Sequence, residues 1–184
     1  GANLCEMTQI GLRVPPGFTI TTEACLAYLA ESRLPAGLMD EVRAHVTALE
    51  KKTGKGFGDG RNPLLVSVRS GSAMSMPGMM DTILNLGLNR KTLEGLIART
   101  DDPRFGHDAH RRFIQLFGKI ALGVPDELFD AAMAGVKRRY HAKDDVDLSA
   151  KALEELAAEF LGIVESRTGK AFPEATRQLA LQAD

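Results

Sequence analysis

An apolar run, an arginine and a loop of small residues follow one another over residues 64–82. Residues 64–68 predict a buried strand, and Arg69 stands directly after it. Because an arginine carries a permanent charge and a planar fork of donors, it suits a phosphate group. The small residues that follow let backbone N–H groups approach an anion closely; they are Gly71, Ser72, Ala73, Ser75 and Gly78. This order predicts a site that grips a polyphosphate.

The same loop carries four methionines around Pro77, which are Met74, Met76, Met79 and Met80. Two interpretations stay open for them. Methionine side chains commonly fill gaps in a protein core. In a loop of small residues they can instead form a mobile lid, which shelters a planar ring or a pyrophosphate from water.

Further phosphate-binding and metal-binding patterns are weaker. Each Gly-Lys pair lacks the serine or threonine that completes a P-loop. We interpret the alternating glycines at residues 56–60 as a flexible surface loop. His107 and His110 lie three residues apart without a further ligand at metal-binding spacing, so we expect solvated or capping histidines. No metal site is predicted.

Charged groups in the second half have ordinary interpretations too. The pair Arg111 and Arg112 is typical of a solvated helix face, although Arg112, beside the apolar Phe113, can also emerge at the inner edge of the helical part. The aspartates at residues 144–147 suggest either a carboxylate cluster or, as we favour, a solvated turn before the helix cap Ser149.

Composition limits the possible partners. The 184 residues are 44% hydrophobic and 26% charged with a net charge of −1, so no global field attracts nucleic acid or an acidic membrane. No apolar run approaches the roughly 20 residues that span a bilayer, and no signal-peptide pattern is present. Cys5 and Cys25 lack a charged neighbour that would stabilise a thiolate and predict reduced thiols. We expect a cytoplasmic protein, and both chain ends suggest a fragment.

Periodicity and caps predict the elements that position the arginines. We expect a first helix between Asn3 and Gly11. Further helices are expected over residues 22–30, 36–52, 91–99, 105–123, 126–142, 149–168 and from 174 onward. Strands are expected over residues 17–20, 64–68 and 82–87. Only helices follow Asn89, so the fold class is α+β, with an α/β unit over residues 1–88 and a helical unit over residues 89–184.

Several segments closely resemble the pyruvate phosphate dikinase family. They are VSVRSG at residues 66–71, SMPGMMDT at 75–82, LNLGL at 84–88, GANL at 1–4, VPPGFTITTEAC at 14–25 and RRF at 111–113. The resemblance extends over essentially the whole chain. Phosphoenolpyruvate synthases share only the Val-Arg-Ser start and differ through the glycine–methionine loop. A water-using dikinase of the same superfamily and a stand-alone, non-catalytic module with this fold are the competing interpretations.

The resemblance implies an N-terminal ATP-grasp nucleotide-binding domain, of which residues 1–88 are a part, with an inserted helical subdomain over residues 89–184. It implies transfer of the β-phosphoryl group of ATP to a histidine on a separate swivelling domain and then to pyruvate. ATP, pyruvate and phosphate become AMP, phosphoenolpyruvate and diphosphate, with Mg²⁺ and a monovalent cation required. A homodimer is implied for the full-length enzyme.

Site residues also follow from the resemblance. Arg69 matches an arginine that contacts the ATP phosphates and stabilises the transferred charge, and Arg112 matches a second phosphate-binding arginine. Gly78 and Met80 match a loop whose backbone amides close over the phosphates. The remaining expected ATP contacts in this segment are Ser70, Gly71, Ser75, Met76 and Met79.

Several functional groups of the family have no counterpart in these 184 residues. They are a lysine directly before the segment that begins at Gly1, the acidic Mg²⁺ ligands and the phosphate-accepting histidine. Cys5 stands where the family often has alanine. We therefore expect no metal ligands and no dikinase activity from this chain by itself.

Overall fold

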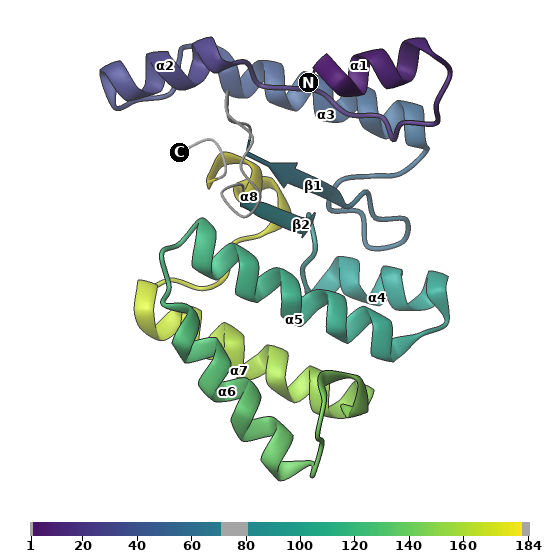
Figure 1. The fold of residues 1–184 in the computed structure, drawn as a ribbon, viewed down its shortest axis with the longest axis vertical. Coiled ribbons are helices and arrows are strands. Elements are labelled where there is room, and N and C mark those ends of the chain that lie inside the picture. Colours follow the sequence, from purple (N-terminus) through teal and green to yellow (C-terminus); the bar gives the residue numbers. More distant parts are fainter. Residues whose placement is uncertain (1, 71–80, 182–184) are drawn as a thin grey trace. The chain divides into compact units, whose positions relative to one another are not determined.

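The structure of the chain, a computed structural model, describes residues 2–70 and 81–181 (Figure 1). It divides between residues 55 and 56 into two compact units. We call them unit 1, up to residue 55, and unit 2, from residue 56, and each is described by itself. Among the helices in the described ranges, none is both long enough and apolar enough to cross a membrane.

Unit 1 contains three helices, α1 (Ala2–Gln9), α2 (Thr22–Glu31) and α3 (Leu38–Thr53). Val42 and Val46, four residues apart on α3, are its buried apolar side chains. The helix ends at Gly54, whose positive φ of 66° is the left-handed conformation that glycine adopts without steric cost. A hollow of about 360 Å³ lies between α2, α3 and the extended segment that precedes α2.

The strand predicted over residues 17–20 is wrong. These residues form neither a helix nor a strand and have no strand partner in the described part of the chain. Instead, the ring of Phe18 stacks on the His45 ring of α3 at a centroid distance of 5.1 Å. Pro15 and Pro16 have no backbone N–H, so the chain entering this segment lacks two of the donors that a strand pairing uses.

Unit 2 begins with two antiparallel strands, β1 (Val66–Arg69) and β2 (Thr82–Leu86). Val66 faces Leu86 and Arg69 faces Thr82, with an irregularity between Val66 and Val68. The helices that follow are α4 (Arg90–Thr100), α5 (Pro103–Ile120), α6 (Asp126–Arg139), α7 (Ala150–Thr168) and α8 (Ala175–Leu181). A short 3₁₀ turn, η1 (Asp145–Asp147), precedes α7.

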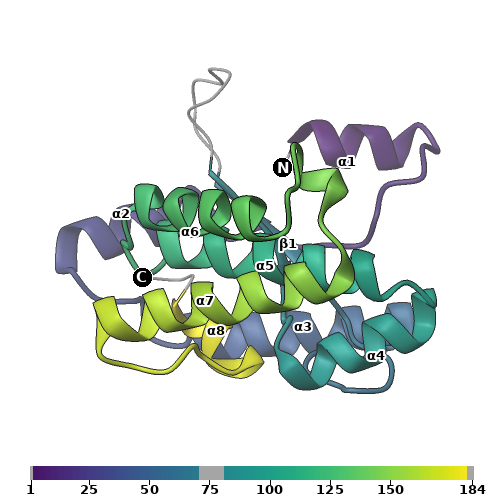
Figure 2. The same ribbon diagram turned by 90° about the horizontal axis from the view of Figure 1, so that it is seen from below.

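Helix α5 is the centre of unit 2 because two of its faces are apolar. One face carries Phe113 and Phe117, which pack with Ile83 and Leu86 of β2 in one buried cluster. The other face carries Ile114, which packs in a second cluster with residues of α6 and α7 such as Phe129. Figure 1 shows α5 between the strand pair and these two helices, and Figure 2 shows α6 and α7 from below, running along α5. The two strands are thereby fixed to the helical part.

The turn from β2 into α4 is closed by a buried glutamine from α8. Gly87, with φ of 99°, donates its N–H to Gln178 Oε1 at 2.8 Å. Gln178 Nε2 donates to the carbonyls of Leu88 and Pro173 at 3.1 and 2.9 Å. Thr92 Oγ1 donates to the Gly87 carbonyl at 3.0 Å. These bonds satisfy backbone groups that would be costly to bury unpaired.

The predicted helices, the strand pair and the α+β class are confirmed, apart from the strand over residues 17–20. The strand that ends at Arg69 is less buried than predicted, because only one neighbouring strand covers it among the described residues and Ser67 and Arg69 are exposed. The predicted division at residue 88 does not coincide with the boundary at residue 55, since the strands pack on α5. It remains a proposal about the larger protein.

Candidate functional site

Arg69 ends β1 with an exposed side chain. Within the described ranges its guanidinium is engaged in neither an ion pair nor a hydrogen bond. The backbone of Arg69 is paired with Thr82, so the strand presents an exposed, charged end group. Such an arrangement leaves the donors of the arginine available to an anion.

Ser70 and Asp81 close the base of the glycine–methionine loop. The backbone N–H and the Oγ of Ser70 both donate to the Asp81 carbonyl, at 3.2 and 3.1 Å. This use of Ser70 holds the two ends of the loop together and extends the β1–β2 pairing. Six of the predicted ATP contacts lie outside the described residues and stay predictions; they are Gly71, Ser75, Met76, Gly78, Met79 and Met80. Both interpretations of the methionines stay open for the same reason.

The base of the loop lies near the C-terminal half of α5. The pKa of Lys119 is raised above its ordinary value, chiefly by the hydrogen bond that its Nζ donates to Asp126 Oδ2 at 2.7 Å. The carboxylates of Asp81 and Asp130 add to this effect. Strand β2 begins directly after Asp81 and packs on Phe113 and Phe117 of α5, which places the base of the loop beside this helix.

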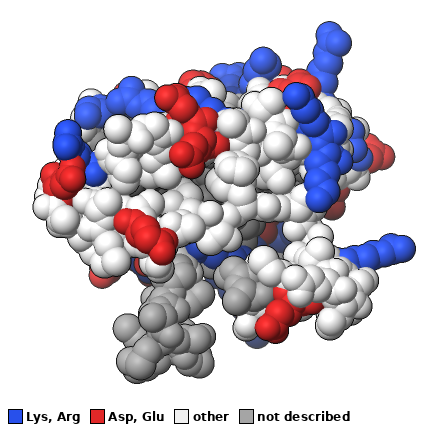
Figure 3. All heavy atoms as spheres, turned by 90° about the horizontal axis from the view of Figure 1, so that it is seen from above, with Lys and Arg blue, Asp and Glu red and all other residues white. Residues whose placement is uncertain are grey.

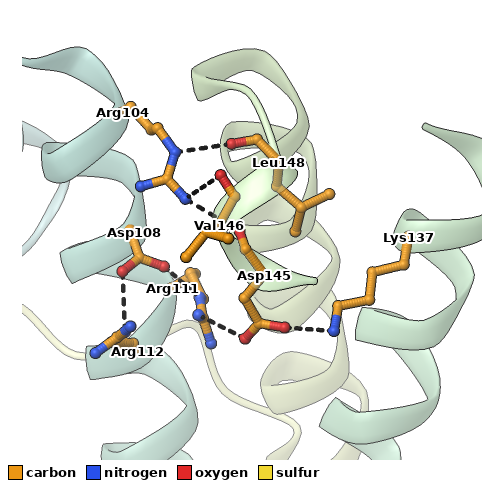
Figure 4. Close-up of polar contacts among 8 residues, drawn as sticks. All are labelled: Arg104, Asp108, Arg111, Arg112, Lys137, Asp145, Val146 and Leu148. Carbon is orange, nitrogen blue, oxygen red and sulfur yellow. Dashed lines mark hydrogen bonds and ion pairs between the residues drawn. The ribbon is translucent and has the colours of Figure 1, made fainter. Parts of the chain in front are cut away.

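Helix α5 also carries the arginine pair, and its two members have different surroundings. Arg111 is buried, with 6% of its side chain exposed, whereas 56% of the Arg112 side chain is exposed. Asp108, one turn earlier, contacts both: its Oδ1 accepts from Arg111 Nε at 2.8 Å, and its Oδ2 lies 2.9 Å from Arg112 Nε (Figure 4). The solvated face predicted for the pair is therefore wrong for Arg111.

Asp145 anchors the other end of Arg111. The Nη2 of Arg111 donates to Asp145 Oδ2 at 3.1 Å, and Lys137 of α6 pairs with Asp145 Oδ1. The pKa of Asp145 lies below its ordinary value, chiefly because Lys137 donates a hydrogen bond to it and also because Arg111 is close. The solvated turn predicted at residues 144–147 is confirmed, because Asp144, Val146 and Asp147 are exposed, and the Asp145 side chain is 42% exposed although it is also paired. A buried arginine ties Asp145 to α5.

Arg104, one turn before Asp108 on α5, fixes the backbone of the same turn. Its Nε donates to the Leu148 carbonyl at 3.0 Å, and its Nη2 donates to the carbonyls of Asp145 and Val146, both at 3.0 Å (Figure 4). Arg104 thereby donates to three backbone carbonyls of this turn, of which that of Asp145 also accepts from the Leu148 N–H. The turn is held to α5 by its backbone as well as by the Asp145 side chain.

The histidines on α5 differ from the expectation of solvated or capping groups. His110 is 7% exposed, and its pKa is lowered to about 4, chiefly by burial and further by nearby His107. His107 Nδ1 is buried without a hydrogen-bond partner in the described part of the chain. Among the described residues no group of three or more His, Cys, Asp or Glu side chains could hold a metal ion.

The two expected phosphate-binding arginines are joined only through packing. No hydrogen bond or ion pair links Arg69 to Arg112 in the described ranges, but Val68 and Phe113, their chain neighbours, belong to one apolar cluster. The hollow in unit 1 is lined by neither arginine. On the face drawn in Figure 3, positive and negative side chains are both scattered over a mostly uncharged surface.

The sequence reasoning missed Asp108, and it considered Asp145 without its pairing to Arg111. A signal for Asp108 was present, because it precedes Arg111 and Arg112 by three and four residues, the spacing of ion pairs on one helix face. For Asp145 no such signal exists, since its partner Arg111 is 34 residues away in the chain.

Comparison with known proteins places the chain beside pyruvate, phosphate dikinases. It is 53% identical over 174 residues to the enzyme of Entamoeba histolytica, covering 94% of this chain and 20% of that protein. It is 49% identical to the enzyme of Giardia intestinalis and 46% identical to that of Rhizobium meliloti, each match covering 95% of this chain and 20% of the relative. No family model matches. The resemblance seen in the sequence is confirmed, and the chain spans about a fifth of the length of these relatives.

Proposed function

We propose that this chain is the part of a pyruvate, phosphate dikinase that takes hold of the ATP phosphates. In this proposal residues 1–88 belong to an ATP-grasp subdomain and residues 89–184 to a helical subdomain. The observation that carries it is the exposed Arg69 guanidinium, free of internal partners in the described chain, at the mouth of a loop whose sequence resembles that of the family. The identity of 46–53% to three dikinases supports it.

Phosphoryl transfer depends on position and positive charge more than on covalent chemistry by the protein. Arg69 places a permanent charge at the end of a fixed strand, where it can stabilise negative charge on the transferred group. Ser70 joins the two ends of the loop through its hydrogen bond to the Asp81 carbonyl. In this proposal the backbone amides of the loop bind the phosphates. Arg112 supplies a second charge from α5.

The remaining steps of the proposed reaction belong to other parts of the protein. A swivelling domain would receive the β-phosphoryl group on a histidine and pass it to pyruvate, giving phosphoenolpyruvate, AMP and diphosphate. Mg²⁺ and a monovalent cation are proposed for the whole enzyme, which we expect to be a cytoplasmic homodimer. The described residues offer no donor set for a metal, so no step assigned to them passes through one.

The proposal is tested by replacing Arg69 in the natural protein. Arg69→Ala is expected to slow phosphorylation of the acceptor histidine by ATP by about 10²-fold or more, the scale of losing one preorganised charge contact. The measurement is single-turnover transfer of labelled β-phosphate, with pyruvate-dependent AMP formation as a second readout. Arg99→Ala, which removes an exposed arginine of α4, is the matched control. A near-normal transfer rate in Arg69→Ala would refute the role.

A further inference from the structure

We propose that Asp108 is a positioning residue that holds the Arg112 guanidinium ready for a phosphate group. The proposal rests on the proposed function, in which Arg112 contacts ATP. Asp108 Oδ2 lies 2.9 Å from Arg112 Nε, while Asp108 Oδ1 accepts from Arg111 Nε at 2.8 Å. One carboxylate therefore holds both arginines, and it is 17% exposed.

The atom that Asp108 uses on Arg112 decides what remains for a ligand. A guanidinium has five N–H groups in a fixed plane, and a phosphate takes two of them in parallel. Asp108 pairs with Arg112 through Nε, on the inner edge of that plane. Neither Nη group donates a hydrogen bond to any residue that the structure describes, and 56% of the side chain is exposed. The ion pair thus fixes the arginine without occupying its outer donors.

Asp108 can position Arg112 because its second carboxylate oxygen is held by Arg111. Arg111, buried to 6% exposure, links Asp108 to Asp145, and Lys137 of α6 pairs with Asp145 in turn. In Figure 4 these groups form a row of alternating charge that runs from Lys137 to Arg112. The row joins α6 and η1 to α5, so the position of Arg112 depends on three elements.

An ion pair on a helix surface constrains its arginine less when its carboxylate contacts no buried partner. On α3, Asp40 pairs with Arg43 at 2.8 Å, but 83% of the aspartate and 65% of the arginine side chain are exposed. Such a pair constrains its arginine weakly, because both side chains remain free to move in solvent. The pair of Asp108 and Arg112 also lies one helical turn apart, but it has a buried anchor. Asp40→Asn is therefore a matched control for Asp108→Asn.

The test is a double-mutant cycle on ATP handling in the natural protein. Arg112→Gln, Asp108→Asn, the double variant and Asp40→Asn are compared by ATP affinity and by the single-turnover rate of histidine phosphorylation. Asp108→Asn is expected to lose about 10-fold or more, since a slightly misplaced contact is costly for phosphoryl transfer. The double variant is expected to be no worse than Arg112→Gln, because Asp108 acts only through Arg112. Asp40→Asn is expected to match the parent.

The outcomes separate this inference from the function on which it rests. If Arg112→Gln handles ATP like the parent, Arg112 has no phosphate role, and the role of Asp108 falls with it. Only the role of Asp108 is refuted if Arg112→Gln is defective while Asp108→Asn is normal. The same holds if the loss in the double variant equals the product of the losses in the two single variants. Asp108→Glu keeps the charge and covers the case in which Asp108→Asn does not fold. Its loss should be smaller than that of Asp108→Asn and should vanish in the Arg112→Gln background.

Discussion

The stability of unit 2 should depend on pH through one buried histidine of α5. Burial, with a smaller contribution from His107, lowers the pKa of His110 to about 4, compared with an ordinary value of about 6.5 in an unfolded chain. As the pH falls, the unfolded state therefore takes up a proton before the folded state does. The stabilisation is fully present above about pH 6.5 and is lost progressively as the pH falls toward 4.

The size of this loss follows from the difference in pKa. Each unit corresponds to about 1.4 kcal/mol, so the free energy of unfolding should fall by about 1.4 kcal/mol at pH 5.5 and about 2.5 kcal/mol at pH 4.5, relative to pH 7.5. Against a total stability of about 5–15 kcal/mol this is a large fraction. The pKa values of Asp126 and Asp145 are also lowered, and these carboxylates add a loss of the same sign at lower pH.

Urea unfolding at pH 7.5, 5.5 and 4.5, followed by circular dichroism, measures the effect. His110→Gln removes the titrating group. Between pH 7.5 and pH 4.5 the free energy of unfolding of this variant should therefore decrease less than that of the parent, and the two decreases should differ by about 2.5 kcal/mol. His141→Asn is the control, because His141 is exposed and its φ of 51° lies in the region that asparagine tolerates. Equal acid dependence in His110→Gln and the parent would contradict the lowered pKa of His110.

Two further substitutions, each compared with a second variant, test the packing around α5 and the turn from β2 into α4. Gly118→Ala should destabilise the chain by about 1–3 kcal/mol, because its Cβ would lie 2.8 Å from Phe129 Cζ. Gly135→Ala should instead stabilise α6 by up to about 1 kcal/mol, because a Cβ there meets nothing within 4 Å. Equal changes in the free energy of unfolding of Gly118→Ala and Gly135→Ala, measured with urea, would contradict this account. Gln178→Leu should cost about 2–4 kcal/mol in the same assay, because three buried backbone groups lose their partner, whereas exposed Arg177→Gln should be nearly neutral. A Gln178→Leu chain as stable as the parent would refute this assignment.

Most helices could be predicted from the sequence because their signals are local. The apolar spacing on α5 and the caps Asn89 and Ser149 act within a few residues of the chain. The strand that ends at Arg69 was found for the same reason. The error at residues 17–20 shows the limit of such signals, since an extended segment becomes a strand only when another strand pairs with it.

The candidate site also contains residues that local sequence reveals and properties that depend on tertiary packing. Arg69 could be recognised from its neighbours, because a strand end followed by small residues is itself a pattern in the chain. Asp108 was recognisable from spacing alone, although its importance was not, since nothing local shows that Arg111 is buried. The pKa of His110 was beyond sequence reasoning because it depends on what covers the ring.

The sequence by itself determined the α+β class, the order of the elements and the likeness to dikinases, because each of these is written in periodicity, caps and motif residues. Only the tertiary structure decided which charges are paired. Arg111 and Asp145 are 34 residues apart and meet because α5 and the turn before α7 fold against each other. The burial of Arg111 strengthens its contacts with Asp108 and Asp145, whereas Arg112 is the most exposed member of the row.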